Sequence, residues 1–114
     1  MGRVQHRLTQ ERDFQKVRRR GKSFFSPYFR LSYHQNQLAR SRYAVAVGIR
    51  VSKKATERNR LKRRVREAVR VRLGSLKPGY DIVFSLRPAA MDATGAQMRL
   101  AVHEALRKSQ LTSS

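Results

Sequence analysis

The chain has 114 residues, which is enough for one domain with a modest core. It has 27 Lys and Arg residues against 7 Asp and Glu, a formal net charge of +20, and such a charge attracts polyanions. The absence of cysteine excludes a disulfide framework and a thiolate zinc site, and no apolar run approaches the roughly 18 residues that span a bilayer. The N-terminus lacks an apolar signal-peptide core, so we expect a cytoplasmic protein.

The first element is a predicted helix that follows a basic arm. Residues 1–7 are expected to be flexible, and the helix is predicted from about 10 to 19. Thr9 is the expected N-cap, and Gly21 is expected to end the helix as its C′ residue.

The next segment, residues 22–34, is aromatic and rich in residues that favour strands. Pro27 interrupts it, so we expect the paired strand to begin near Tyr28. From there the side chains alternate between a core face and a face that is free for a ligand. The core face takes Phe29, Leu31 and Tyr33, and the other face takes Arg30, Ser32 and His34.

Two further strands are predicted on either side of a basic helix. Residues 42–51 are nearly continuously apolar, as in a strand covered on both faces, and residues 80–86 form the last strand. The helix between them spans about residues 57–72, with Ser52 or Thr56 as its cap. This strand, helix, strand unit favours parallel strands.

The chain ends in a predicted helix that Asp92 or Thr94 caps, and residues 109–114 are expected to fray. Its apolar positions recur every three or four residues: Met98, Ala101, Val102, Ala105 and Leu106. With no repeat and no linker, we expect residues 1–114 to form a single RNA-binding domain. Its predicted fold class is α/β (α+β), a two-layer sandwich with the order α-β-β-α-β-α.

The basic helix is the most informative stretch. Its apolar residues form one stripe at helical spacing: Leu61, Val65, Ala68, Val69 and Leu73. Asn59, Arg63, Arg66 and Arg70 fall on the opposite face. Like-charge pairs at i,i+4 and cations near the N-terminus destabilise such a helix locally. A solvated charged face would fit mixed signs better, so the pattern indicates an anionic partner.

The sequence offers little for catalysis by side chains. The seven acidic residues are scattered singly, the three His residues are isolated, and there is no phosphate-binding glycine loop. Aromatic residues beside basic ones, Phe14 with Lys16 and Tyr28 with Arg30, suit stacking on single-stranded RNA. The alternative, that these aromatic residues are ordinary core, stays open.

Three segments together resemble the protein subunit of bacterial ribonuclease P. They are ERNRLKRRVRE at 57–67, RLTQERDFQKVRRRG at 7–21 and YDIVFSLRP at 80–88, and the resemblance covers roughly residues 7–108. One departure is that Ser52-Lys53-Lys54 runs directly into Ala55 without the family's usual Gly-Lys-Ala turn.

The resemblance implies a left-handed β-α-β crossover, as in a ribosomal-protein domain. It implies an accessory subunit of a holoenzyme that removes the 5′ leader of precursor tRNA. An RNA subunit would perform the catalysis with Mg²⁺ held mainly by RNA, and neither a metal nor a catalytic side chain is expected in the protein. The predicted contacts with the RNA subunit are Lys53, Lys54, Arg58, Asn59, Arg60, Lys62, Arg63, Arg66 and Arg70. The predicted leader contacts, in a cleft between the first helix and the sheet, are Phe14, Lys16, Val17, Tyr28, Arg30 and Ser32.

Two alternatives remain at this point. A ribosomal protein of similar fold would bind RNA without a leader cleft. A membrane-active cationic protein would need a large exposed apolar face, whereas the stripe on the basic helix is narrow. We expect no protein partner and no membrane partner.

Overall fold

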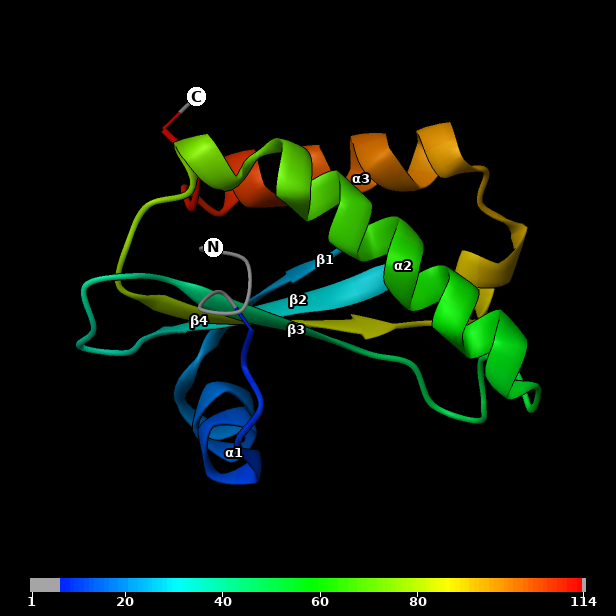
Figure 1. Ribbon diagram of the computed structural model, residues 1–114, viewed down its shortest axis with the longest axis horizontal. Helices are drawn as coiled ribbons and strands as arrows, with labels where there is room; N and C mark the ends of the chain where they lie inside the picture. The colour runs from blue at the N-terminus through cyan, green and yellow to red at the C-terminus, as the bar shows by residue number, and fades with distance from the viewer. Residues whose placement is uncertain (1–6, 114) are drawn as a thin grey trace.

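The computed structural model describes residues 7–113, which form one mixed α+β fold with three helices and a four-stranded sheet (Figure 1). The fold class is as predicted, with one strand, β1, that was not predicted. The elements are α1 (Glu11–Arg20), β1 (Lys22–Phe25), β2 (Phe29–Gln35), β3 (Arg42–Ala46), α2 (Ala55–Val71), β4 (Tyr80–Leu86) and α3 (Gly95–Lys108). Short 3-10 turns at Leu73–Ser75 and Pro88–Asp92 flank β4.

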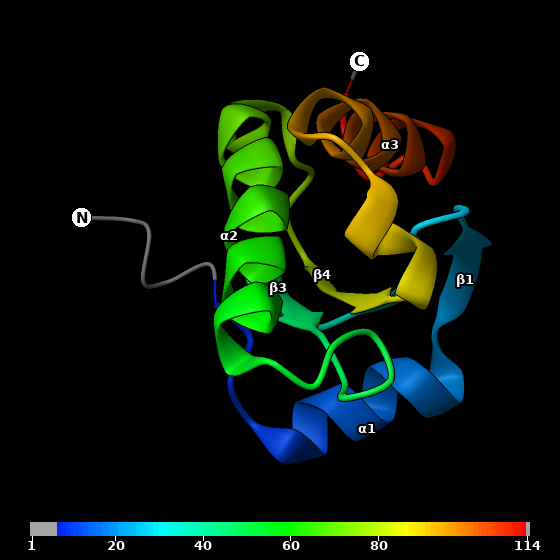
Figure 2. The same ribbon diagram turned by 90° about the vertical axis from the view of Figure 1, so that its right-hand side faces the viewer.

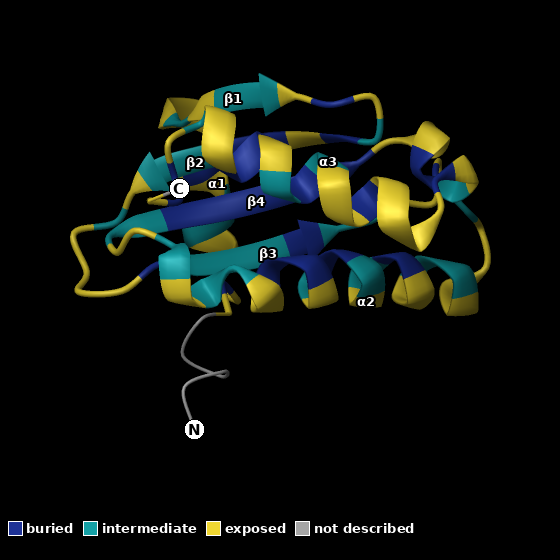
Figure 3. Ribbon diagram, turned by 90° about the horizontal axis from the view of Figure 1, so that it is seen from above, coloured by how far each residue is buried: buried dark blue, intermediate teal, exposed yellow. Residues whose placement is uncertain are grey.

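The sheet has the order β1-β2-β4-β3. β2 is antiparallel to β1 and β4, and β3 is parallel to β4, as the strand, helix, strand unit predicted. In Figure 3 the chain passes from β3 through α2 to β4 in a left-handed crossover. About 98% of such connections are right-handed. The unusual hand agrees with the expectation from the family resemblance.

Helices cover both faces of the sheet (Figure 2). α2 and α3 lie over one face and enclose the main core, whose large buried members include Phe29, Leu31, Leu61, Val65, Ile82, Phe84, Met98 and Leu106. α1 lies across the opposite face over a small cluster of Leu8, Val17 and Val83. The predicted two layers, sheet and helices, therefore gain a partial third layer from α1.

Strand β3 is shorter than predicted and ends at Ala46 rather than at Val51. It is an edge strand with β4 as its one partner strand, so its side chains are mostly half-buried instead of covered on both faces. Val51 returns to the core from the loop that follows, which explains why the apolar run continued past the strand.

Two of the three helices begin at an N-cap residue other than the predicted one. Gln10, not Thr9, is the N-cap of α1, and Lys54, not Ser52 or Thr56, is the N-cap of α2; neither makes a side-chain capping hydrogen bond. For α3 the N-cap is Thr94, one of the two predicted candidates. Its hydroxyl accepts from Gln97 N at 3.0 Å, and the Gln97 side chain accepts from Thr94 N at 2.9 Å.

Gly21 ends α1 for a different reason from the one predicted. Its backbone is extended, with φ −77° and ψ 163°, and not left-handed. A Cβ atom at this position would lie 2.4 Å from Val17 O and 2.6 Å from Tyr33 O. The glycine is therefore required because the end of α1 packs directly against the backbone of β2.

The prediction that residues 109–114 fray is wrong for residues 109–113, which are packed against the rest of the fold. The arm at residues 1–7 was also predicted to be flexible, and of this arm only Arg7 lies within the described residues. Leu111 is buried against the main core. Its carbonyl accepts from Lys77 N at 2.8 Å, and Ser113 N donates to Ser75 O at 2.9 Å. Arg7 forms a parallel bridge with Tyr43 at the edge of β3.

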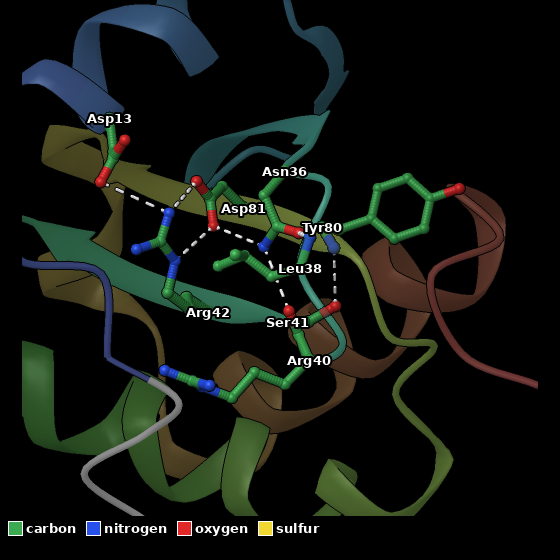
Figure 4. Close-up of polar contacts among 8 residues, drawn as sticks. All are labelled: Asp13, Asn36, Leu38, Arg40, Ser41, Arg42, Tyr80 and Asp81. Carbon is green, nitrogen blue, oxygen red and sulfur yellow. Dashed lines mark hydrogen bonds and ion pairs between the residues drawn. The ribbon is translucent and has the colours of Figure 1, made fainter.

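A polar network fixes α1 to one end of the sheet (Figure 4). The Arg42 guanidinium donates to both carboxylate oxygens of Asp81, at 2.8 and 2.7 Å, and lies 3.4 Å from Asp13 of α1. Asn36 Nδ2 also donates to Asp81, at 2.9 Å. Arg42 thus joins α1, β3 and β4.

Candidate nucleic-acid interface

The outer face of α2 carries the basic residues predicted to bind RNA. Asn59, Arg60, Arg63 and Arg70 are exposed, and Arg66 is half-buried. The opposite side of the helix buries Leu61, Val65, Ala68 and Val69 in the main core. Packing on one side thus fixes the direction in which the cationic face points, away from the main core. We call Asn59, Arg63, Arg66 and Arg70 the α2 face.

The α2 face continues onto residues that the sequence did not indicate. Arg63, Arg66 and Arg70 line a shallow hollow of about 170 Å³ together with Arg7 and Tyr43. Burial raises the pKa of the Tyr43 hydroxyl, although the nearby Arg66 and Arg7 act in the opposite direction. Only the count of basic residues before the first helix could have pointed to Arg7.

The start of α2 is held by its own polar contacts. Ser52 Oγ donates to the Glu57 carboxylate at 2.5 Å and accepts from Lys54 N at 3.1 Å, and Arg58 Nη1 donates to Ser52 O at 3.0 Å. Glu57 in the first turn offsets part of the unfavourable interaction between nearby cations and the helix dipole. Lys53 and Lys54 are exposed beside this turn, whereas Arg58 and Lys62 are half-buried at the border of the stripe.

Besides Arg58, two further basic residues of α2 have intramolecular partners. Arg64, which was not predicted to bind RNA, donates from Nη1 to Ala93 O at 2.9 Å and so serves the packing of the fold. Arg70 pairs with Glu67 one turn earlier, and this hydrogen bond lowers the pKa of the Glu67 carboxyl. Glu67 is thus an exposed carboxylate that lines the same hollow as the α2 face.

The six residues predicted to contact a leader do not come together. Phe14 and Arg30 lie on the α1 side of the sheet, where Phe14 is half-buried and Arg30 is exposed. Val17 and Ser32 are only 1% and 3% exposed, so they offer almost no surface on this side. Tyr28 packs against the main core on the α3 side, so its assignment to the same surface is wrong.

Lys16 lies in a separate hollow between α1 and the sheet. This hollow, of about 240 Å³, is lined by Asp13, Lys16, Arg20, His34 and Arg42 among others. Helical spacing places Lys16 about 200° from Phe14 around α1, so the two residues flank the helix on opposite sides. A cleft beside α1 is thus present on the Lys16 flank.

Two aromatic residues on the α1 side carry an arginine over the ring. The guanidinium carbon of Arg18 lies 6.0 Å from the Phe14 ring centroid, and that of Arg30 lies 5.6 Å from the Phe25 ring centroid. Arg30 Nε also donates to Ser23 Oγ at 3.1 Å. Phe25, which is 64% exposed, was missed because β1 was not recognised as a strand.

The described residues include no group of three His, Asp or Glu side chains that would hold a metal ion. Asp13 and Asp81 both interact with Arg42, so the carboxylates nearest the Lys16 hollow are already paired. Within the described residues, no helix is long and apolar enough to cross a membrane.

The sequence and the fold both match proteins of one kind. A family model described as Ribonuclease P matches residues 3–110. The ribonuclease P protein component of Clostridioides difficile is 41% identical over 88 residues, covering 76% of each chain. That of Chloroflexus aurantiacus is 38% identical over 107 residues, covering 93% of this chain and 78% of the relative.

Solved structures agree with this match. The RNase P protein from Thermotoga maritima is similar with a TM-score of 0.81 and 32% identity, over 90% of this chain and 96% of that one. A mutant of the Staphylococcus aureus RNase P protein is similar with a TM-score of 0.88 and 25% identity, over 95% of this chain and 91% of that one.

The sheet, the left-handed crossover and the cationic α2 face define a small basic α+β protein of the ribonucleoprotein-subunit class. The chain belongs to the ribonuclease P protein family, whose members are protein components of a tRNA-processing ribonuclease. This membership implies an RNA partner.

Proposed function

We propose that this protein binds the catalytic RNA of ribonuclease P through the α2 face and assists removal of the 5′ leader from precursor tRNA in the cytoplasm. The observation that carries the proposal is the α2 face itself, which presents Arg63, Arg66 and Arg70 with a single nearby carboxylate, Glu67. An arginine guanidinium group can donate two parallel hydrogen bonds to a phosphate. The Asn59 amide adds a donor and an acceptor that would fix the register of the helix along the RNA. Lys53, Lys54 and Arg60 extend the same surface.

The leader is proposed to run along the α1 side of the sheet. Phe14 and Arg30 offer an aromatic ring and a cation on this side, and Lys16 offers a second cation across α1. Val17 and Ser32 support this surface from below, because both are buried. Tyr28 leaves the proposed leader set because it packs towards α3.

Catalysis is proposed to belong to the RNA subunit, with Mg²⁺ held by RNA. The protein would supply binding energy from a part of the substrate that is remote from the scissile bond, and this energy positions that bond. Its cations would also neutralise phosphates near the metal sites. Precursor tRNA should therefore bind more tightly than mature tRNA, because only the precursor carries a leader.

The test is 5′-end cleavage of a precursor tRNA at low Mg²⁺ by the matching ribonuclease P RNA, with and without this protein. We expect the protein to stimulate cleavage and the double variant Asn59→Ala, Arg63→Ala to lose most of the stimulation while it keeps the circular dichroism of the parent. The matched control is Arg99→Ala, Arg107→Ala, two exposed residues of α3, which removes more charge than the test variant does.

The control should stimulate cleavage as the parent protein does. Equal losses in both double variants would mean that total charge, and not the α2 face, carries binding. Stimulation without any preference for precursor over mature tRNA would contradict the leader assignment. No stimulation at all, with stable association with ribosomal subunits, would favour the ribosomal alternative.

A further inference from the structure

A third hollow lined by basic residues lies at the end of the sheet that is remote from the start of α2, and the proposed function does not use it. It has a volume of about 320 Å³ and is lined by Arg20, Lys22, Tyr33, His34, Gln35 and Tyr80. We call it the Tyr33–Tyr80 hollow. Its size is that of a small-ligand site.

The backbone sets the geometry of this hollow. Lys22 is opposite Tyr33 in the β1–β2 pair, and Gln35 is opposite Tyr80 in the β2–β4 pair. Gly21 allows the end of α1 to approach the Tyr33 carbonyl, which brings Arg20 to the same place. Four elements therefore converge here through hydrogen-bonded strands and a close packing contact, so the hollow is formed before any ligand arrives.

The lining has the chemistry that recognises a nucleotide. The Tyr33 and Tyr80 rings are half-buried, with centroids 6.4 Å apart at 66°. Neither hydroxyl has a hydrogen-bond partner within residues 7–113. The Gln35 amide adds a donor and an acceptor beside them. A base can stack on a tyrosine ring while these groups bind its polar edge.

The charge of the hollow is uncompensated. Arg20 and Lys22 are exposed, and no Asp or Glu is among the lining residues. Asp81 follows Tyr80 directly in β4, but alternation along the strand turns it to the other face, where Arg42 binds it. Figure 4 shows the Tyr80 ring pointing away from this network. The hollow therefore favours an anionic ligand.

The hollow adjoins the one that contains Lys16. The two share Arg20, His34 and Gln35. A bound strand could thus pass from the Tyr33–Tyr80 hollow along the flank of α1 that carries Lys16, with cations at successive phosphates.

We propose that the Tyr33–Tyr80 hollow binds one nucleotide of single-stranded RNA. The base stacks on Tyr80 or Tyr33, and Arg20 and Lys22 bind its phosphate. This inference rests on the proposed function to the extent that RNA is the partner. The nucleotide comes either from the RNA subunit or from the precursor leader, and both present the same chemistry.

Direct binding is tested with the full chain and a fluorescein-labelled oligouridine of about eight nucleotides, a length within the usual range of single-strand sites. We expect Arg20→Ala, Lys22→Ala and, separately, Tyr80→Leu to weaken binding about tenfold, and Tyr80→Phe to retain most of it because the ring still stacks. The matched control, Arg99→Ala, Arg107→Ala, removes the same charge from α3. Equal affinities for the control and the Arg20, Lys22 variant would overturn the proposal.

Tyrosine emission gives a second readout that does not depend on charge. The chain has four tyrosines and no tryptophan, so stacking of unlabelled oligouridine on Tyr33 or Tyr80 should quench the protein fluorescence. The quench should disappear in the double variant Tyr33→Phe, Tyr80→Phe, which still binds. An unchanged quench in that variant would place the base elsewhere and overturn the proposal.

The reconstituted holoenzyme then identifies the source of the nucleotide. If the RNA subunit supplies it, the Arg20, Lys22 variant assembles with that RNA more weakly and keeps the dependence of substrate affinity on leader length. If the leader supplies it, assembly is unchanged and the dependence on leader length is reduced. Failure of the proposed function is distinct, because it would appear as no stimulation of cleavage by the parent protein.

Discussion

Helices α1 and α2 pack on opposite faces of the same sheet, and both are strongly basic, but they are held in different ways. α2 buries a continuous apolar stripe in the main core, namely Leu61, Val65, Ala68 and Val69. α1 buries Val17, and its Asp13 makes an ion pair with Arg42. Apolar packing stabilises α2 and offsets the repulsion between like charges on its outer face. This face can therefore carry charges of nearly one sign that are available to bind a partner.

The attachment of α1 uses contacts of a more specific kind. It depends on the small cluster with Leu8 and Val83, on the ion pair with Arg42 and on the absence of a Cβ at Gly21. An ion pair needs a defined distance between its charged groups, and a side chain at Gly21 would collide with the carbonyl oxygens of Val17 and Tyr33. The position of α1 relative to the sheet is therefore set by few residues, and the two hollows beside it depend on them.

The largest expected effect compares core truncations under the two helices. Leu61→Ala should lower the free energy of unfolding by about 2–5 kcal/mol, because it leaves a cavity in the main core. Val17→Ala removes fewer carbons from a smaller cluster and should cost about 2 kcal/mol. Urea unfolding followed by circular dichroism measures both. A greater loss of stability from Val17→Ala than from Leu61→Ala would mean that apolar burial holds α1 more strongly than α2.

A smaller effect is expected from breaking the polar network at α1. Hydrogen bonding to Asp81 raises the pKa of Arg42, so the guanidinium stays charged at all accessible pH values. Arg42→Gln should cost about 1–3 kcal/mol, because it leaves Asp81 without its charged partner. Hydrogen exchange should accelerate in α1 and not in α2.

The control for this prediction is Arg70→Gln, which breaks an exposed ion pair on α2. Exposed pairs contribute little, so this variant should leave hydrogen exchange in both helices nearly unchanged. Uniform acceleration across α1 and α2 in Arg42→Gln would mean that the network stabilises the whole fold and does not specifically attach α1.

The sequence predicted best those features that depend on local periodicity and local chemistry. The stripe of α2 follows from spacing alone, and the cap of α3 was narrowed to Asp92 or Thr94, of which Thr94 forms the capping box with Gln97. The same spacing placed Asn59 and Arg63 on one exposed face. These are properties of a single helix, so no knowledge of the neighbouring elements was needed.

The features that could not be predicted depend on partners that are distant in the sequence. The C-terminal residues pack because Thr112 pairs with Leu76 in an isolated bridge, and Arg42 finds its partner 39 residues away in Asp81. Ser32 looked available for a ligand because periodicity indicates a second face of the sheet but not what covers it. Val17 was assigned to the leader by the family resemblance, and the packing of α1 onto the sheet buries both side chains.

The smallest effect concerns the carboxylate beside the α2 face. Arg70 lowers the pKa of Glu67, so Glu67 is ionised at neutral pH and holds one cation of the face in an internal pair. Glu67→Gln should release Arg70 for phosphate, strengthen binding to the catalytic RNA about two- to threefold and steepen the salt dependence by about one phosphate contact. Filter binding over a series of salt concentrations measures both. A carboxylate with a depressed pKa keeps its ion pair above that pKa and loses it as the pH falls through that pKa. The RNA affinities of the parent protein and of Glu67→Gln should therefore become equal in acid.

The matched control is Glu104→Gln, which breaks the i,i+4 pair with Lys108 on α3 and removes the same charge. If that control strengthens RNA binding as much as Glu67→Gln does, the gain reflects net charge and does not support RNA binding at the α2 face.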